Sequence, residues 1–444
     1  MKRSGALALA TAAGTALVLV LVLVLVVMPR SRPAGGAACG RPGPARLDPG
    51  RLAGVAPAAP RRTRQLPGGV ARAYQFLDQM MDLRTTGPER RLVQSYTGGL
   101  LGQRGDTTAS TYDNAVVIDA YLAEGSTGAL ARAETIGNAL VYLQAHDPAH
   151  DGRLRNGYAP AVLDGAGATG VADPASSTGT LAWAGQALAQ LYAATGIRAY
   201  LRGAIGLGGW IQLRCSDRRG PGGYTGGDTA AGARIGWKST EHNIDVYAFF
   251  RLLARETGNP VWSQRAAWAR RFVGSMWNPD QGRFDLGTAA DGVTRNDAAQ
   301  VEDVNSWSYL ALRDPAYTAA VGWDVSHLGV AAAGYRGVSY CTGDRTGLWF
   351  EGTAHVADAL RLRDQPGDSA QAASFLAGLA YAQAHGPNAD GLGIMAASRD
   401  TLSDCQGGDL YASLHTGTTA WYILAAEGID PLSGTPVARQ AARR

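Results

Sequence analysis

Hydrophobic residues recur with a helical period in twelve long segments of this chain, from Gly69 onward. Six segments are expected to form outer helices, and six that fall between them are expected to form inner helices. The outer segments are 69–84, 128–145, 198–213, 259–276, 315–331 and 368–384, and the inner segments are 112–124, 178–194, 241–257, 302–313, 350–363 and 416–427. The pattern predicts an all-α domain of six helical pairs over residues 67–430.

The inner segments share features that mark them as copies of one structural unit. They begin about every 60 residues, except for a shorter interval between the fourth and fifth, and such a period indicates stacked helical pairs. Three of them open with Gly-Thr, at Gly179, Gly352 and Gly417, where a small residue permits close approach of a neighbouring helix. Six pairs can close into a ring or form an open solenoid. Inner segments that are apolar nearly all round, such as 181–191 and 246–253, favour the ring.

The start of the third inner helix holds the densest cluster of chemically active residue types. Lys238 is one of only two lysines among the 41 basic residues of the chain. It stands beside Glu241, His242 and Asn243, and Trp237 precedes it. Because Lys and Arg side chains are not interchangeable, a lysine kept in this cluster suggests that an ammonium group has a role there.

This organisation resembles the six-hairpin (α/α)6-toroid superfamily of glycosidases and related sugar-active enzymes, over about residues 69–430. Besides the helix count, three segments carry the resemblance: Tyr112-Asp113-Asn114-Ala115 opens the first inner helix, Trp237–Asp245 opens the third, and Gly347–Ala354 opens the fifth. These motifs identify the superfamily and no single family within it. The resemblance implies a toroid in which the inner helices all point the same way, so that their N-termini meet at one end of the axis.

The acidic residues at these inner helix starts are the candidate catalytic residues. Glycoside hydrolysis needs a protonated carboxylic acid to donate a proton to the leaving oxygen, and a carboxylate that activates water or attacks carbon. The candidates are Asp113, Glu241, Asp303 with its neighbour Glu302, and Glu351. Acids that converge on one axis can also raise one another's pKa, which a general acid requires.

Among these acids, Glu241 is the expected general acid, because Lys238 and His242 stand close enough in sequence to tune its proton. Asp113 or Glu351 is then expected to activate water, which gives an inverting reaction.

A second set of residues at the helix starts is expected to bind the sugar. Flat aromatic faces stack on sugar rings, and polar side chains exchange hydrogen bonds with hydroxyl groups. The set comprises Tyr112, Asn114, Trp237, Lys238, His242, Asn243, Trp307 and Trp349. Each has a plainer alternative as a cap, a packing residue or a surface ion pair. His355 and His415 are expected to be structural.

Two other classes of function remain open from the sequence. Polysaccharide lyases and sugar epimerases share the toroid and use His, Tyr or Lys as proton shuttles, which keeps His242, Lys238 and Tyr112 as candidates for that chemistry. A non-catalytic glycan-binding protein would keep the aromatic cleft but not the paired acids. The sequence contains no metal-binding or nucleotide-binding motif, so we expect no cofactor.

The N-terminal residues have a different composition from the rest. An apolar run over residues 5–28 follows Lys2 and Arg3. At ~1.5 Å per residue it reaches roughly 36 Å, enough to cross a bilayer. We therefore expect residues 1–28 to be a signal-anchor, which implies a single-pass membrane protein with an extracytoplasmic domain. If the segment is instead a cleaved signal peptide, the protein is secreted.

The flanking segments and the charge complete this organisation. Residues 29–66 are rich in Pro, Gly, Ala and Arg and are expected to be a flexible tether, and residues 431–444 a disordered tail. Residues 1–64 carry ten Lys and Arg and one Asp, whereas the remainder holds 31 basic and 36 acidic side chains. A mildly acidic domain argues against nucleic acid as a partner. The sequence gives no information on the oligomeric state.

Two cysteines are expected to pair. Cys341 and Cys405 stand in the connectors before the fifth and sixth inner helices, which are neighbours in a ring. A disulfide there fits an oxidising compartment.

Overall fold

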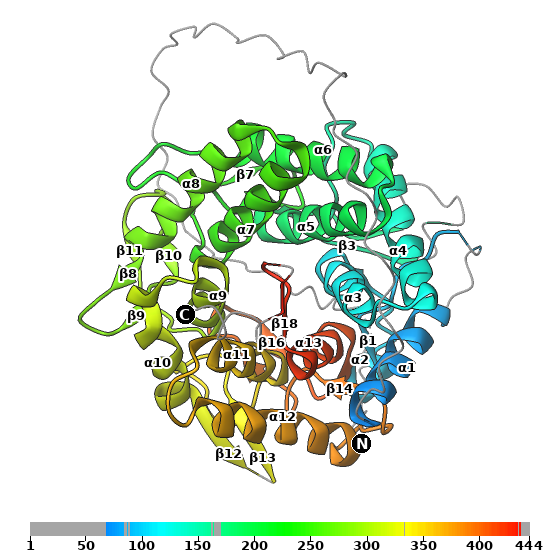
Figure 1. Ribbon diagram of the computed structural model, residues 1–444, viewed down its shortest axis with the longest axis vertical. Helices are drawn as coiled ribbons and strands as arrows, with labels where there is room; N and C mark the ends of the chain where they lie inside the picture. The colour runs from blue at the N-terminus through cyan, green and yellow to red at the C-terminus, as the bar shows by residue number, and fades with distance from the viewer. Residues whose placement is uncertain are drawn as a thin grey trace, which may run out of the picture.

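The computed structural model describes residues 68–83, 87, 89–160, 163, 170–332, 334–433 and 435–436. Over this part of the chain, two concentric layers of helices surround one axis (Figure 1). The outer helices are α1 (Gly68–Asp82), α4 (Thr127–Ala145), α6 (Arg198–Cys215), α8 (Pro260–Ser275), α10 (Thr318–Leu328) and α12 (Asp368–His385). The inner helices are α3 (Thr111–Glu124), α5 (Thr178–Thr195), α7 (Thr240–Thr257), α9 (Asp303–Leu312), α11 (Phe350–Arg363) and α13 (Thr416–Glu427).

The inner helices form a closed ring. Each contacts the next in chain order, and α13 contacts α3, so the last hairpin meets the first. The prediction of six helical pairs is confirmed for the described residues. The helices also include the short α2 (Gly99–Gln103), and a single 3-10 turn (Pro315–Tyr317) precedes α10 where the sequence pattern suggested one continuous segment.

Hydrogen bonds at the inner helix starts join each hairpin to the next. One residue at each start, which we call the linking residue, donates its backbone N–H to a carbonyl in the connector of the following hairpin. The donors and acceptors are Thr111 and Asn156, Thr178 and Gly226, Thr240 and Leu286, Glu302 and Tyr340, Phe350 and Ala396, and Thr416 and Ser95, at N···O distances of 2.8–3.1 Å. The last of these bonds runs from α13 to the connector before α3 and closes the circle.

Threonine serves as the linking residue at four of the six helix starts. There the hydroxyl donates a second hydrogen bond to the same connector, at Arg155, Thr225, Asp285 and Gln94 respectively, with O···O distances of 2.6 Å. These bonds satisfy carbonyls that would otherwise be buried without a partner.

Short strands of two to four residues lie mainly in the connectors. They are β1 (Tyr96–Thr97), β2 (Ala109–Ser110), β3 (Gly157–Tyr158), β4 (Val171–Asp173), β5 (Ser176–Ser177), β6 (Gly227–Asp228), β7 (Arg234–Ile235), β8 (Trp277–Asn278), β9 (Arg283–Phe284), β10 (Gly287–Thr288), β11 (Arg295–Asn296), β12 (Gly329–Ala332), β13 (Tyr335–Val338), β14 (Ile394–Met395), β15 (Leu402–Ser403), β16 (Asp409–Leu410), β17 (Leu414–His415), β18 (Ile429–Asp430) and β19 (Thr435–Pro436). All pair antiparallel; the three-stranded sheets are β1-β17-β14, β2-β3-β4 and β5-β6-β7.

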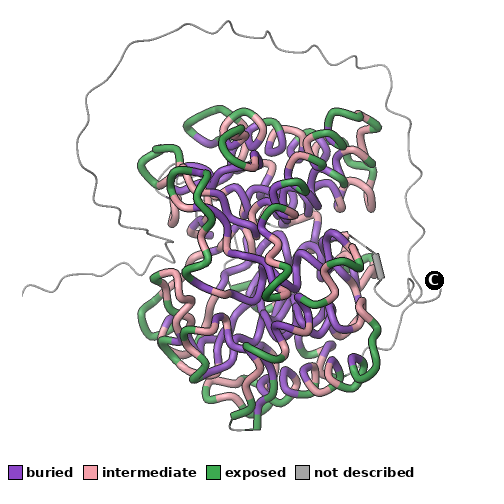
Figure 2. The backbone as a smooth tube through the Cα atoms, turned by 90° about the vertical axis from the view of Figure 1, so that its left-hand side faces the viewer, coloured by how far each residue is buried: buried purple, intermediate pink, exposed green. Residues whose placement is uncertain are grey.

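The core lies between the two layers of helices and around the inner ring. Inner helices are buried on nearly all sides, whereas the outer helices expose one face, and Figure 2 shows this contrast along the backbone. The inner helices also approach closely. A Cβ atom on Gly185 of α5 would lie 2.2 Å from the ring of Phe249 of α7, so only glycine fits there.

The chain end closes the axis at the C-terminal ends of the inner helices. β18 turns back into the centre of the ring (Figure 1). There Asp430 pairs with Arg313 at the end of α9, and Gln186 donates a hydrogen bond to the carbonyl of Pro431 at 3.2 Å. Leu432 is buried. The fold therefore extends past residue 430, where the sequence suggested that a tail begins; residues 437–444 lie outside the described residues.

The predicted membrane segment, residues 5–28, and the tether, residues 29–66, also lie outside the described residues. In the part of the chain that the structure describes, no helix is long and apolar enough to cross a bilayer. The longest, α4, has 19 residues and contains Arg132 and Glu134. The expectation of a single-pass membrane protein with an extracytoplasmic domain is therefore corrected, because the described fold supplies no membrane span.

Candidate active site

A cavity of about 1220 Å³ opens at the end of the ring where the inner helices begin. Its floor is formed by first turns and their caps, from which Tyr112, Asp113, Glu241, His242, Glu351 and His415 reach it. Its walls come from the connectors and carry the aromatic side chains of Tyr96, Trp237, Tyr340 and Trp349. The inner helix starts therefore bring acids and aromatic rings to a single cavity.

The residue after each linking residue occupies an equivalent place in all six inner helices. These residues are Tyr112, Gly179, Glu241, Asp303, Glu351 and Gly417. The two glycines leave room for functional side chains of their neighbours. A Cβ atom on Gly417 would lie 2.6 Å from Oδ1 of Asp113, and one on Gly179 would lie 2.5 Å from the ring of His242. The glycines of α5 and α13 thus leave the space that His242 and Asp113, from neighbouring helices, occupy.

Glu351 lies at the centre of a hydrogen-bonded group on the floor. Tyr112 donates its hydroxyl proton to Oε1 at 2.6 Å, and Trp421 in turn donates its indole N–H to the Tyr112 oxygen at 2.8 Å. Thr418 donates to Oε2 at 3.5 Å. Burial raises the pKa of Glu351, while the nearby rings of His415 and His355 act to lower it. Both carboxylate oxygens therefore have partners that hold them in place.

His415 lies between two carboxylates. Its Nε2 is 3.3 Å from Oδ1 of Asp113, and its Nδ1 is 3.4 Å from Oε2 of Glu351. The ring stacks on Tyr96 with centroids 4.3 Å apart. Nδ1 accepts the backbone N–H of Thr418 at 3.2 Å, so in the neutral ring the proton lies on Nε2 and faces Asp113. Burial acts to lower the pKa of His415, but the two carboxylates raise it above its ordinary value of 6.5.

Glu241 has a different environment from Glu351. It lines the cavity, and no described residue donates a hydrogen bond to its carboxyl group. Burial, together with the negative charges of Asp303 and Glu351, raises the pKa of Glu241 well above 4.5. The carboxyl of Asp245, one turn further along α7, is buried and also has a raised pKa, from burial and from Glu241. Burial and these neighbouring charges therefore favour the protonated, neutral form of Glu241.

Asp303 does not line the cavity. Its Oδ2 accepts a hydrogen bond from the Tyr340 hydroxyl at 3.3 Å, and it is Tyr340 that reaches the cavity surface. Burial and the charge of Glu302 raise the pKa of Asp303 to about 7. Glu302 is fully buried, 3.0 Å from Nδ1 of His355, so these acids form a second layer behind the cavity wall.

The ammonium group of Lys238 is directed away from the cavity. Its Nζ donates a hydrogen bond to the carbonyl of Arg219 at 2.6 Å and lies 3.7 Å from a carboxylate oxygen of Asp217, and its side chain is fully buried. Burial lowers the pKa of Lys238, although Asp217 acts in the opposite direction. Lys238 therefore joins the residues just before α7 to an earlier part of the same connector, around Asp217 and Arg219.

Three other predicted binding residues lie away from the cavity surface. Asn114 and Asn243 are fully buried and each bonds both the N–H and the carbonyl of one connector residue, Val93 and Tyr224 respectively. Trp307 is buried beneath the floor, with its ring 6.4 Å from that of Tyr112. The remaining predicted residues of the set, Tyr112, Trp237, His242 and Trp349, all line the cavity.

The residues that sequence analysis missed come from connectors and caps. His415 was considered structural, yet it lines the cavity beside both Asp113 and Glu351. It is the residue before the linking residue of α13, so counting positions at each helix start would have found it. Tyr96, Tyr340 and Asp404 stand in segments without periodicity, and no local signal marks them.

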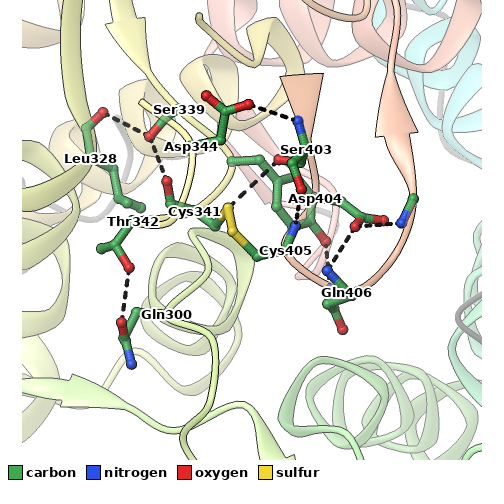
Figure 3. Close-up of a disulfide and its surroundings, with 12 residues drawn as sticks. Gln300, Leu328, Ser339, Cys341, Thr342, Asp344, Ser403, Asp404, Cys405 and Gln406 are labelled. Atoms are coloured by element: carbon green, nitrogen blue, oxygen red, sulfur yellow. Dashed lines mark hydrogen bonds between the residues drawn. A yellow bond between two sulfur atoms is a disulfide. The ribbon is translucent and has the colours of Figure 1, made fainter. Parts of the chain in front are cut away.

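A disulfide fixes one wall of the cavity. Cys341 and Cys405 are bonded, with Cα atoms 6.3 Å apart, and join the connectors before α11 and α13 (Figure 3). Beside it, the backbone N–H of Gln406 donates to Oδ1 of Asp404 at 2.7 Å, and the side chain of Gln406 donates to the Tyr340 hydroxyl at 3.2 Å. In the described residues no group of three or more His, Cys, Asp or Glu side chains is arranged to hold a metal ion.

Comparisons with known proteins rest on structure alone. No protein-family model matches the chain, and no curated protein matches it in sequence. Among solved structures, a D-mannose isomerase is 12% identical with a TM-score of 0.59, covering 81% of this chain and 94% of its own. A sugar epimerase from a ruminal bacterium is 12% identical with a TM-score of 0.56, covering 81% of this chain and 99% of its own.

A glycoside hydrolase is similar to the same extent. It is an inactive variant of the alpha-1,6-mannanase of Salegentibacter sp. HEL1_6 in complex with alpha-1,6-mannotriose, 12% identical with a TM-score of 0.53, covering 82% of this chain and 98% of its own. At these identities the likeness concerns the fold, and it extends over nearly the whole length of each of these proteins. The chain therefore shares the six-hairpin toroid fold of these proteins.

Proposed function

We propose that this protein is a carbohydrate-active enzyme that hydrolyses glycosidic bonds in an oligosaccharide or polysaccharide, with Glu241 as the general acid and Asp113 as the base that activates water. The observation that carries the proposal is the contrast between two acids on one cavity floor. Glu241 has no described hydrogen-bond donor and a strongly raised pKa, whereas Asp113 faces the Nε2 of His415 at 3.3 Å. Two carboxyl groups in different protonation states are what this reaction requires.

Glu241 fits the acid because its surroundings favour the protonated carboxyl group. Asp303 and Glu351 both act to keep the group neutral, and the cavity gives a glycosidic oxygen direct access to it. After the bond breaks, Glu241 is left as a carboxylate at the start of α7, where the helix dipole stabilises negative charge.

Asp113 fits the base because His415 holds its carboxyl group in place. His415 donates or shares a proton at Oδ1, so the other oxygen is available to orient a water molecule. Glu351 is assigned a positioning role, because Tyr112 and Thr418 occupy its two oxygens while it supports the far side of His415. This division predicts an inverting reaction, in which water attacks the sugar from the face opposite the leaving group.

The proposal is tested with Glu241→Gln and Asp113→Asn against a panel of polysaccharides, with reducing-end analysis. Each variant is expected to lose at least a hundredfold in kcat while its thermal unfolding midpoint stays close to that of the parent. Glu89→Gln, which changes an exposed glutamate far from the cavity, is the matched control. Full activity in Glu241→Gln would overturn the assignment of the acid, and glycan binding with no turnover in the parent would favour a binding protein.

A second function is supported by His415. A histidine flanked by two carboxylates at the cavity surface can take a proton from a sugar carbon and return it, as an isomerase or epimerase requires. Incubation of the parent with sugars in deuterium oxide separates the two functions. Deuterium at a sugar carbon without any new reducing end indicates isomerisation or epimerisation, whereas a new reducing end without carbon-bound deuterium indicates hydrolysis.

A further inference from the structure

We propose that the cavity selects glycans that carry no carboxylate or sulfate groups, so that polymers of uronic acids are excluded. The inference deepens the proposed function, on which it rests, by naming the class of substrate. It follows from which charges line the cavity and from where the cationic side chains are directed.

Acidic side chains surround the cavity on all sides. Asp113, Glu241 and Glu351 reach its floor from three different inner helices, α3, α7 and α11. Three more acids line it from connectors of different hairpins: Asp106 before α3, Asp173 before α5 and Asp404 before α13. An anionic sugar would therefore meet acidic side chains both on the floor and along the connectors.

The cationic side chains among the described lining residues do not offset these acids. They are Lys238 and Arg104, together with His415 and His242 when these are protonated, and burial lowers the pKa of His242 to about 4. Lys238 directs its ammonium to Arg219 and Asp217, and His415 is already placed between Asp113 and Glu351. Arg104 is exposed at the edge, with its guanidinium over the ring of Tyr411 at 5.5 Å. No lining cation is thus placed to accept a carboxylate deep in the cavity.

The N-termini of α3, α7 and α11 do not supply the missing positive charge. The partial charge of a helix start falls off within its first turn, and here the first turns of α3, α7 and α11 carry Asp113, Glu241 and Glu351. A uronate carboxylate would lose its hydration without gaining a partner, which is costly. Uncharged sugars meet the opposite situation, because carboxylates accept hydrogen bonds from hydroxyl groups and the four wall aromatics offer faces for stacking.

The test compares pairs of oligosaccharides of equal length and linkage that differ in a carboxylate, such as β-1,4-mannan with β-1,4-mannuronan and β-1,4-glucan with β-1,4-glucuronan. Binding is measured by titration calorimetry with the Glu241→Gln variant, so that turnover does not obscure it. At least one neutral oligosaccharide is expected to bind ten times or more tighter than its uronate counterpart, and the ratio is expected to shrink as salt is raised. Equal or tighter binding of the uronate overturns the inference.

A charge-reversed cavity gives the second arm of the test. Asp106→Lys combined with Asp173→Lys, introduced into the same Glu241→Gln background, is expected to reduce the neutral-to-uronate ratio at least fivefold. Glu89→Lys with Asp280→Lys makes the same charge change at exposed sites outside the cavity and is expected to leave the ratio unchanged. If the lysine pair unfolds the protein, Asp106→Asn with Asp173→Asn makes the same comparison with a smaller expected reduction.

The outcomes separate this inference from the proposed function. Selective binding of neutral glycans without hydrolysis by the parent supports the inference and contradicts the assignment as a hydrolase. Hydrolysis of a uronate polymer supports a hydrolase and contradicts the inference. Binding of neither member of any pair contradicts both, and an unchanged ratio in the lysine pair contradicts the electrostatic cause.

Discussion

At the scale of single residues, the cavity floor and the layers behind it carry a concentration of buried titratable groups that is costly to the fold. Glu241, Asp245, Glu302 and Asp324 all have a pKa raised well above the ordinary value, chiefly by burial. Several of their oxygens have no partner within the described residues. Such groups persist in active sites because the strain of burying them produces the protonation states that catalysis needs.

The proposed acid makes a prediction about activity and pH. Because the pKa of Glu241 is raised, the group is protonated and active below that value and loses its proton as pH rises through it. The profile of kcat/KM is therefore expected to fall on its alkaline side at a pH well above 4.5. Removing a nearby negative charge should shift this alkaline side of the profile. Asp303→Asn removes the repulsion between Asp303 and Glu241, so the fall in kcat/KM is expected to move to lower pH. An alkaline side that stays fixed would indicate that another group controls it.

The same burial predicts how stability changes with pH. The pKa of Asp303 is about 7 in the folded protein and near 3.8 when unfolded, so its contribution to stability is complete below pH 3.8 and is lost as pH rises to about 7. The asparagine in the Asp303→Asn variant does not titrate, so this variant does not lose that stability as pH rises. Relative to the parent it is expected to gain roughly 3–4 kcal/mol of stability between pH 4 and pH 8, because each tenfold difference in proton affinity between the folded and unfolded states corresponds to about 1.4 kcal/mol.

Urea unfolding of both proteins at pH 4, 6 and 8 measures that gain. Asp314→Asn, which alters an aspartate that pairs with Arg270 on the outside of the ring, is a control expected to show a much smaller change. A constant difference between Asp303→Asn and parent at all three pH values would contradict the prediction.

At the scale of helices and connectors, much of the architecture could be predicted because it follows from local pattern. The twelve long helices lie where the hydrophobic period put them; α11 and α13, for example, have the predicted bounds 350–363 and 416–427. The helix starts also brought Asp113, Glu241 and Glu351 to one cavity, since the first turns of parallel inner helices meet at one end of the axis.

What could not be predicted depends on contacts between hairpins. Whether Lys238 reaches the cavity or a loop depends on the path of residues 216–224, which no periodicity reveals. The role of Asn243 likewise depends on Tyr224, which lies 19 positions away in the chain. The walls of the cavity come from connectors whose strands have only two to four residues, too short to leave an alternating pattern.

The linking threonines give a prediction at this scale. Thr240→Val removes the hydroxyl that donates to the buried carbonyl of Asp285, while keeping the shape of the side chain. The free energy of unfolding is expected to fall by about 1–3 kcal/mol, because the carbonyl loses a partner. Thr135→Val, in the outer helix α4, removes only a bond within the same helix and is expected to cost less. Denaturant unfolding of both variants measures the difference, and equal costs would contradict a special role for the links.

At the scale of the whole molecule, the disulfide joins two connectors that are 64 positions apart in the chain. Replacing Cys341 and Cys405 with serine is expected to lower the free energy of unfolding by about 2–4 kcal/mol, since the unfolded chain is no longer constrained. The variant should also bind substrate less tightly, because Cys405, Asp404 and Gln406 all line the cavity. Urea unfolding and a KM measurement check the two effects; a raised KM with kcat unchanged is the expected pattern.

The closed circle of linking hydrogen bonds also determines how the molecule can come apart. An open stack of helical pairs has two ends, and its terminal repeats can fray while the middle stays folded. This ring has no such end, because the bond from Thr416 to Ser95 gives the first and last hairpins the same neighbours as all the others. A hairpin can leave only when two interfaces break together, so the ring resists partial opening until it opens as a whole, and the floor of the cavity shares that resistance.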